Sequence, residues 1–186
     1  MTKSKSLPQR ARVLESRTIF RGKVVQLKVE RVAEPGGVVA TREVVCHSGS
    51  VVILPHLSGG RIIMVRQYRH AVGETLWELV AGSIEQGETP RKSARRELLE
   101  ETGYRARVMK PLLEFFPSPG VMNEKMHLFE AWDLTLSKSQ PDVDEHLEVG
   151  IFSTGELIKM VQENQIRDAK TLVGILWLFG AHKRTI

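Results

Sequence analysis

The sequence predicts an α+β or α/β/α layered domain. Short β-branched and apolar runs, separated by glycine and proline, occupy most of the chain before residue 82, and this pattern is typical of strands. One helical segment follows over residues 90 to 102, and two more helical segments close the chain after further strand-like runs. Strands grouped around one helix, with helices at the end, favour an α/β/α layered arrangement.

Residues 13–46 are expected to form a small antiparallel sheet in front of the main domain. Pro35 and Gly36 lie in a turn between two of its apolar runs, which is a hairpin signal. Residues 1–12 are expected to be a disordered tail, and residues 47–186 a single domain. The expected strands of the small sheet are Arg17–Ile19, Lys23–Val32 and Val38–Cys46.

The expected helix at Pro90–Thr102 has clear start and stop signals. Thr89 is a good N-cap, Pro90 suits the first helical position, and Gly103 suits the residue after the last turn. The last helix is expected to bury Leu172, Ile175, Leu176 and Phe179. The other expected elements of this domain are strands at Ser50–Pro55, Arg61–Gln67, Trp77–Ala81, Leu112–Phe116, His127–Asp133 and Glu148–Phe152, and helices at Ser153–Asn164 and Asp168–Lys183.

Composition places the chain among ordinary soluble globular proteins. It has 186 residues, of which 41% are hydrophobic and 26% charged, and its net charge of +5 suits a polyanionic ligand, whether nucleic acid or a pyrophosphate. Cys46 is the one cysteine, so an intrachain disulfide is impossible and a reducing compartment is expected. The start lacks an apolar signal segment, and the longest apolar run is too short for a bilayer. We therefore expect a cytoplasmic protein without membrane contact.

Three carboxylates converge in the segment Gly82–Tyr104, which reads GSIEQGETPRKSARRELLEETGY. Glu97, Glu100 and Glu101 have the i, i+3, i+4 spacing that places side chains on one face of a helix. Like charges so close repel one another, and a hard divalent cation with oxygen ligands removes that penalty. The segment therefore predicts a site for Mg²⁺, with Mn²⁺ as a possible substitute.

The same segment resembles the Nudix box at its defined positions except Tyr104, where the family usually has an aliphatic residue. The resemblance implies the Nudix fold, in which a mixed sheet lies between helices, and a hydrolase that cleaves nucleoside diphosphates linked to another group. It also implies that Glu97 and Glu101 are the principal metal ligands, that Glu100 is an accessory ligand, and that the Ala81 carbonyl joins them. Gly82 lacks a Cβ, so metal and phosphates can approach the backbone there.

Two further box residues and the general base leave alternatives open. Arg96 and Glu88 are interpreted as a pair that holds the loop on the helix, although Glu88 could instead join the metal cluster. In the family's ADP-ribose branch the base commonly comes from a later acidic loop, where Glu145 is the best candidate, ahead of Asp144 and Glu148. If that loop is only a solvated surface, a box glutamate such as Glu100 would activate the water.

Residues outside the box resemble the branch that hydrolyses ADP-ribose and related sugar nucleotides. Pro119 stands at the spacing from Gly103 that marks this branch, and Arg69 is a candidate phosphate ligand. Glu78 could accept a hydrogen bond from a sugar hydroxyl or pair with an arginine. Lys170 is interpreted as a surface lysine, with a substrate contact as its alternative.

The resemblance also implies a homodimer in which the N-terminal sheets are exchanged and each site uses both subunits. Arg42 and Phe20 are the corresponding substrate candidates, although Phe20 could be a core residue. The predicted function is Mg²⁺-dependent hydrolysis of ADP-ribose, or of a similar nucleoside diphosphate sugar, to a nucleoside monophosphate and a sugar phosphate. The alternatives are GDP- or UDP-sugar hydrolysis, RNA-end processing and an inactive ligand sensor. No nucleic-acid partner is expected, because the basic residues are dispersed.

Overall fold

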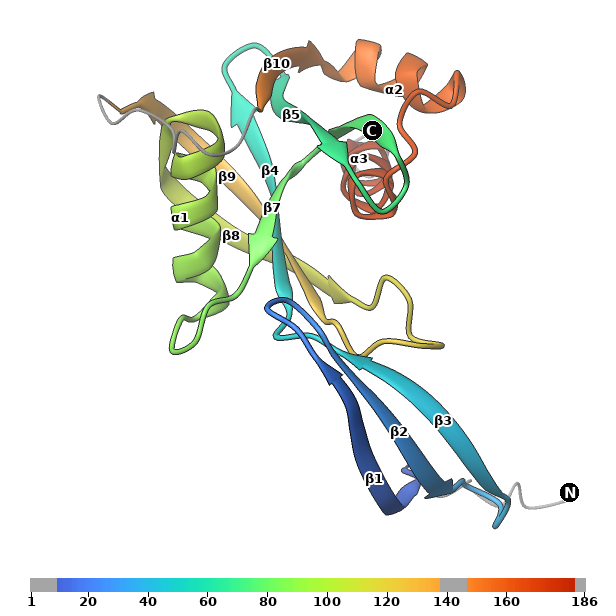
Figure 1. Cartoon of the computed structure of the whole chain (residues 1–186). Helices are drawn as coiled ribbons and strands as arrows, with labels where there is room; N and C mark the ends of the chain where they lie inside the picture. The colour runs from blue at the N-terminus through green and yellow to red at the C-terminus, as the bar shows by residue number, and fades with distance from the viewer. Residues whose placement is uncertain (1–9, 138–146, 183–186) are drawn as a thin grey trace, which may run out of the picture. The chain divides into compact units, whose positions relative to one another are not determined.

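The structure is a computed structural model that describes residues 10–137 and 147–182 (Figure 1). These residues form two compact units. The first contains the described chain up to His47 together with Ser118–Glu124, and the second contains Ser48–Pro117 together with the described chain from Lys125 onward. Most of the expected tail, residues 1–9, lies outside the described residues.

The first unit is built on an antiparallel sheet with the strand order β1-β2-β3. Its strands are β1 (Arg12–Arg21), β2 (Gln26–Ala33) and β3 (Val39–Cys46). The predicted small sheet is confirmed, but β1 begins within the expected tail, because Arg12 pairs with Ala33 in the β1–β2 ladder. Every residue of β1 is exposed, so its sequence lacks the alternation that marks a half-buried strand.

The second unit contains a mixed sheet with the order β10-β5-β4-β9-β8, to which β6 adds beside β5 and β7 beside β4. The β4–β9 pair is parallel and the other pairs are antiparallel. These strands are β4 (Ser50–Leu57), β5 (Arg61–Arg69), β6 (Glu74–Glu78), β7 (Val80–Ser83), β8 (Tyr104–Phe115), β9 (Met126–Leu136) and β10 (Glu148–Ser153). The predicted mixed sheet of an α+β domain is therefore confirmed.

Strand β4 separates two hydrophobic cores. Val51 and Ile53 belong to one core, with Ala94 and Leu98 of helix α1 (Pro90–Thr102), whereas Val52 and Leu54 belong to the other. Helix α3 (Ala169–His182) and helix α2 (Thr154–Gln162) contribute to this second core. Because successive residues of a strand face opposite sides, α1 and α3 cover opposite faces of the sheet, as Figure 1 shows.

The bounds of α1 agree with the prediction, because its end signals are local. The Thr89 side chain accepts a hydrogen bond from the Lys92 amide, and Gly103 adopts the left-handed conformation with φ of 74°. Its amide closes the last turn on the Leu99 carbonyl. In α3 one prediction is wrong: Leu176 is 55% exposed, and the buried position is Leu178 instead.

The expected strand Trp77–Ala81 is in fact divided between two strands. The chain pairs with β5 as far as Glu78 and then with β4 from Val80, and Leu79 at the change is fully buried. The short run Trp77–Ala81 carries no signal of a change of pairing partner, so the sequence could not predict this division.

Two further expectations concerned the burial of Cys46 and membrane-spanning segments. Cys46, interpreted from its apolar surroundings as a buried thiol, is only half-buried at the end of β3. Within the described part of the chain, none of the helices is both long and apolar enough to cross a membrane.

Candidate active site

The box segment runs from β7 through a loop into α1, so the packing of α1 against the sheet positions its carboxylates. Ala94 and Leu98 are fully buried against β4, which leaves the face with Glu97, Glu100 and Glu101 directed toward the β7 backbone and solvent. On the sheet side, Gly82 pairs with Val51 of β4. The loop therefore brings a strand backbone and a carboxylate-bearing helix face together.

Gly82 faces the carboxylate of Glu97 in this site. A Cβ added at Gly82 would lie 2.0 Å from the Glu97 carboxyl carbon, so any other residue at this position would force the Glu97 carboxylate to move. Next to it, the buried Glu101 accepts a hydrogen bond from the Ala81 amide at 3.3 Å. The structure thus brings together three of the predicted metal ligands, Ala81, Glu97 and Glu101, with Gly82, which was predicted to contact the substrate.

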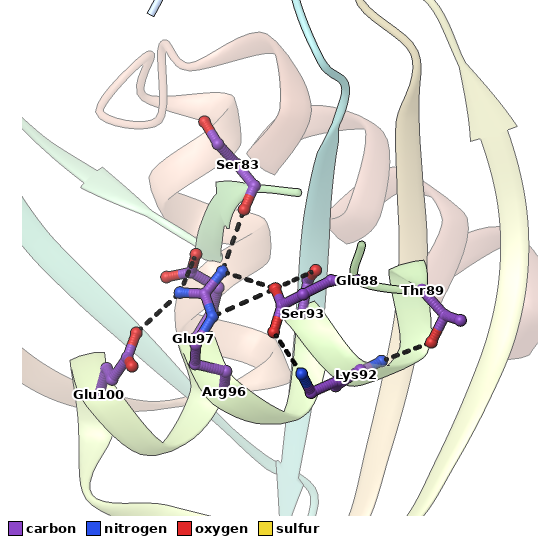
Figure 2. Close-up of polar contacts among 8 residues, drawn as sticks. All are labelled: Ser83, Glu88, Thr89, Lys92, Ser93, Arg96, Glu97 and Glu100. Atoms are coloured by element: carbon purple, nitrogen blue, oxygen red, sulfur yellow. Dashed lines mark hydrogen bonds and ion pairs between the residues drawn. The ribbon is translucent and has the colours of Figure 1, made fainter. Parts of the chain in front are cut away.

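Arg96 connects the remaining box carboxylates, as Figure 2 shows. Its Nη1 donates to Glu97 Oε1 and Glu100 Oε2, both at 2.8 Å, and its Nη2 donates to the Ser83 carbonyl and Glu88 Oε2, both at 3.1 Å. Partial burial lowers the pKa of the Arg96 guanidinium, but hydrogen bonds to Glu88 and Glu100 outweigh this effect and raise the pKa overall. Arg96 is therefore a fixed positive charge among the carboxylates.

Glu88 has the contacts of a structural residue. Its carboxylate accepts a hydrogen bond from Ser93 Oγ at 2.7 Å, is bonded by Arg96, and lies 3.5 Å from the Lys92 ammonium (Figure 2). The bonds from Ser93 and Arg96 lower its pKa from the ordinary 4.5 to about 2. These contacts support the interpretation of Glu88 and Arg96 as the pair that holds the loop on the helix.

The donors of this cluster fit a hard divalent cation. Glu97, Glu100, Glu101 and the Ala81 carbonyl offer only oxygen, and Gly82 leaves the backbone beside them unobstructed. Across the described residues, no group of three or more His, Cys, Asp or Glu side chains already has the arrangement of a metal site. Glu97 and Glu100 are both bonded to Arg96, so holding a cation requires their carboxylates to turn toward it.

A second charged cluster lies at the end of β6. Arg69 donates to both carboxylate oxygens of Glu78, from Nε at 2.8 Å and from Nη2 at 2.7 Å. Lys170 of α3 also pairs with Glu78 and lies 3.0 Å from Asp168. The interpretation of Lys170 as a surface lysine is therefore wrong: the residue is 8% exposed and paired with two carboxylates. Of the two alternatives for Glu78, the structure contains the pairing with an arginine.

Burial and pairing act in opposite directions on this cluster. Burial raises the pKa of the Glu78 carboxyl, but the hydrogen bond from Arg69 and the positive charge of Lys170 outweigh it, so the pKa is lowered overall. The hydrogen bond to Glu78 raises the pKa of Arg69. Sequence reasoning missed the link to α3, although Asp168 and Lys170 are charged residues beside the start of an apolar helix.

The other predicted substrate residues belong to the first unit. Arg42 pairs with Glu34, and Phe20 on β1 is 57% exposed, so its interpretation as a core residue is wrong. Pro119 lies in the Ser118–Glu124 segment of that unit. The box belongs to the second unit.

The predicted base, Glu145, lies outside the described residues, as does Asp144 of the same loop. Glu148, which was the weaker alternative, begins β10 and pairs with Arg66 at 3.2 Å. The structure therefore gives no geometry for Glu145.

A cavity of about 430 Å³ lies at the other end of β4 from the Gly82 pairing. His56 and Trp132, whose rings stack 3.6 Å apart, contribute to its wall, together with the turn at Gly59 and Gly60. The box carboxylates do not line it. The candidate active site is therefore assigned from the carboxylates and not from this cavity.

Comparisons with known proteins agree with this geometry. Residues 47–172 match the model of the NUDIX domain. The chain is 41% identical over 162 residues to an ADP-ribose pyrophosphatase of Bacillus subtilis, covering 86% of this chain and 88% of the relative. It is 36% identical to the methanol dehydrogenase activator of Bacillus methanolicus, covering 90% and 91% of the two chains. The crystal structure of an ADP compounds hydrolase superimposes with a TM-score of 0.84 over 98% of each chain, at 22% identity.

The chain belongs to the Nudix family, because the family model matches more than half of its length and the relatives align over most of it. The predicted Nudix fold is confirmed as well. Members of this family are hydrolases that generally use a divalent metal ion, and the oxygen donors at Ala81, Glu97, Glu100 and Glu101 agree with such a requirement.

The lowered pKa of Glu88 predicts a pH-dependent contribution to stability. Because the folded pKa of about 2 lies below the ordinary 4.5, the contribution is complete above pH 4.5 and is lost as the pH falls toward 2. We expect Glu88→Gln to lower the free energy of unfolding at pH 7 and to approach the wild type as the pH falls through this range. Urea unfolding of the metal-free protein between pH 7 and pH 3 measures the difference.

Glu163→Gln, which removes an exposed carboxylate paired with Lys159, is the control for the change of net charge. A difference between wild type and Glu88→Gln that stays constant from pH 7 to pH 3 would contradict the role assigned to the bonds from Ser93 and Arg96.

Proposed function

We propose that this protein hydrolyses the diphosphate of ADP-ribose, with Mg²⁺ as its metal ion and Mn²⁺ as a possible substitute, to give AMP and ribose 5-phosphate. The observation that carries the hydrolase activity is the assembly of Glu97 and Glu101 against the backbone of Ala81 and Gly82. The choice of ADP-ribose is supported by the Bacillus subtilis pyrophosphatase, which is 41% identical along most of both chains.

The residues of the box have distinct tasks in this proposal. Glu97, Glu101 and the Ala81 carbonyl would hold the cation, with Glu100 as an accessory ligand, and Gly82 lets the diphosphate approach the backbone. The bound cation neutralises the diphosphate oxygens and stabilises the leaving phosphate. Arg96 keeps the Glu97 and Glu100 side chains beside the box, and their carboxylates would turn from Arg96 toward the cation on binding.

The reaction itself is a displacement at phosphorus. A water oxygen forms a bond to one phosphorus of the diphosphate, the bond from that phosphorus to the bridging oxygen breaks, and the water proton passes to a carboxylate base. Arg69 orients the diphosphate through charge-assisted hydrogen bonds. Glu145 is the proposed base, and Glu100 is the alternative. Pro119, Arg42 and Phe20 are proposed as further substrate contacts, with Phe20 stacking on the adenine.

One experiment distinguishes the proposed function from its alternatives. The protein is incubated with ADP-ribose, GDP- and UDP-sugars, dinucleotides and capped RNA in the presence of Mg²⁺, and product release is measured for each. Turnover of a GDP- or UDP-sugar above ADP-ribose would change the substrate assignment, and turnover of capped RNA alone would indicate RNA-end processing. Binding of ADP-ribose without any turnover would indicate a sensor.

Removal of one ligand carboxylate tests the site. We expect Glu97→Gln or Glu101→Gln to lower kcat for ADP-ribose by at least about 10²–10³-fold, because a group that stabilises charge in the transition state is lost. Steady-state kinetics with Mg²⁺ measures the change, and Glu163→Gln is the matched control on the exposed end of α2. A variant with wild-type kcat would mean that the metal site lies elsewhere.

The base assignment has a separate test. We expect Glu145→Gln to lower kcat by about 10²–10⁴-fold with little change in KM, the loss typical of a missing general base. Kinetics of Glu145→Gln and Glu100→Gln are compared over a range of pH. Wild-type kcat in the first variant, with a strong loss and an altered pH profile in the second, would move the role to Glu100.

We further propose that residues 13–46 form the interface of a homodimer and that residues 47–186 form the Nudix domain. Support comes from the first unit, where the fully exposed β1 presents apolar side chains such as Val13, Ile19 and Phe20 to solvent. Exposed apolar surface of this kind favours association with a second protein surface. The cytoplasm is the proposed location.

The dimer proposal predicts a change of oligomeric state. We expect Ile19→Glu to convert a wild-type dimer into a monomer, because the new charge would have to be buried in the interface. Sedimentation velocity at micromolar concentration measures the mass. Gln162→Glu adds the same charge at an exposed position of α2 and should leave the dimer intact. A monomeric wild type would refute the proposal.

A further inference from the structure

Glu78 is the centre of a charge network that joins α3 to the end of β6. Its side chain is 1% exposed, and both of its carboxylate oxygens accept hydrogen bonds from Arg69. Lys170 donates a further hydrogen bond to Glu78 Oε2 and lies 3.0 Å from Asp168 Oδ1. A carboxylate so deeply buried depends on these cations, because an unpaired buried charge is strongly unfavourable.

Arg69 is held by Glu78 and is still accessible to solvent. Nε and Nη2 are both bonded to Glu78, which fixes the plane of the guanidinium through two parallel bonds. The Arg69 side chain nevertheless remains 40% exposed. A guanidinium held in this way can meet an anion from solvent without losing further side-chain freedom.

Lys170 changes the electrostatic balance of this pair. One carboxylate and one guanidinium would neutralise each other and leave little attraction for a phosphate. Lys170 contributes a second cation to the same Oε2 atom of Glu78, so this carboxylate is shared between two cations. With Asp168, which contacts Lys170, the network has two positive and two negative charges, and Arg69 is its exposed cation. Asp168 contacts Lys170 on Oδ1, while its Oδ2 accepts from the amide and hydroxyl of Thr171.

The first turn of α3 has a second connection to the same segment. The fully buried Thr171 accepts a hydrogen bond from the Leu79 amide at 2.8 Å. Lys170 and Thr171 therefore bind two successive residues, Glu78 and Leu79. At this point the chain stops pairing with β5 and begins to pair with β4, just ahead of Ala81. This double connection fixes where Lys170 meets Glu78.

We propose that Lys170 is a positioning residue that acts through Glu78 to orient Arg69 toward the diphosphate of the substrate and to keep the charge of Arg69 available to it. The inference rests on the proposed function, because it takes Arg69 as a diphosphate contact. It assigns Glu78 to the support of Arg69 and not to a sugar hydroxyl, and it gives α3 a part in substrate binding without a substrate contact.

The test measures binding of inorganic pyrophosphate by isothermal titration calorimetry, at low ionic strength and with EDTA present. We expect Lys170→Met to raise the Kd about 10-fold and Arg69→Gln to raise it at least as much. The double variant should match Arg69→Gln alone, because Lys170 acts only through Arg69. Lys170→Arg should restore binding, and Lys159→Met, which removes an exposed lysine of α2, is the control.

Kinetics and stability distinguish positioning from a merely structural role. We expect Lys170→Met to raise KM for ADP-ribose about 10-fold, with kcat within about 2-fold of wild type, at a temperature well below its midpoint of thermal unfolding. If Lys170→Met does not fold, Lys170→Gln keeps a hydrogen-bond donor to Glu78 without the charge and replaces it in both measurements.

Three results would overturn the inference: additive effects of Lys170→Met and Arg69→Gln on the Kd, an unchanged Kd in the folded Lys170 variant, or no pyrophosphate binding by the wild type. The proposed function fails on a different observation, namely the absence of ADP-ribose turnover by a wild type in which pyrophosphate binding and its coupling between Lys170 and Arg69 are intact.

Discussion

The mutual repulsion of the box carboxylates is the constraint on which this site depends. Glu88, Glu97 and Glu100 all contact Arg96, so a single guanidinium lies between three carboxylates, reduces their repulsion and joins Glu88 of the loop to the helix. Because guanidinium donors lie in a fixed fork, they determine directions as well as charge. Arg96 therefore both stabilises the loop and keeps the ligand carboxylates near the Gly82 backbone.

Packing behind the helix makes that arrangement precise enough for chemistry. Ala94 and Leu98 are fully buried in the core on one side of β4, so α1 has little freedom to rotate or slide. Rotation of α1 would carry Glu97 away from Gly82. At Gly82 the strand has no side chain, and this leaves space for the Glu97 carboxylate. The hydrophobic core behind α1 and the charged side chains on its surface thus both help to set the distance between Glu97 and Gly82.

How far the sequence predicts this structure depends on whether each signal is local. The bounds of α1 follow from Thr89, Pro90 and Gly103, which act within a turn of the helix, and the agreement of ligand residues with the box is local too. The change of pairing at Leu79 and the burial of Lys170 depend on which strands and helices meet in three dimensions. No pattern within a short window contains that information.

The two charged clusters of the second unit meet the same short segment from different directions. Arg96 holds the box through α1 on one face of the sheet, and Lys170 reaches Glu78 from α3, which covers the other. Under the proposed function, the first cluster would supply carboxylates to a cation and the second would supply a guanidinium to an anion. A metal-bound diphosphate needs both kinds of partner, because the cation leaves some phosphate oxygens unpaired. The division explains why the box alone indicates the reaction, whereas the choice of substrate depends on residues outside it.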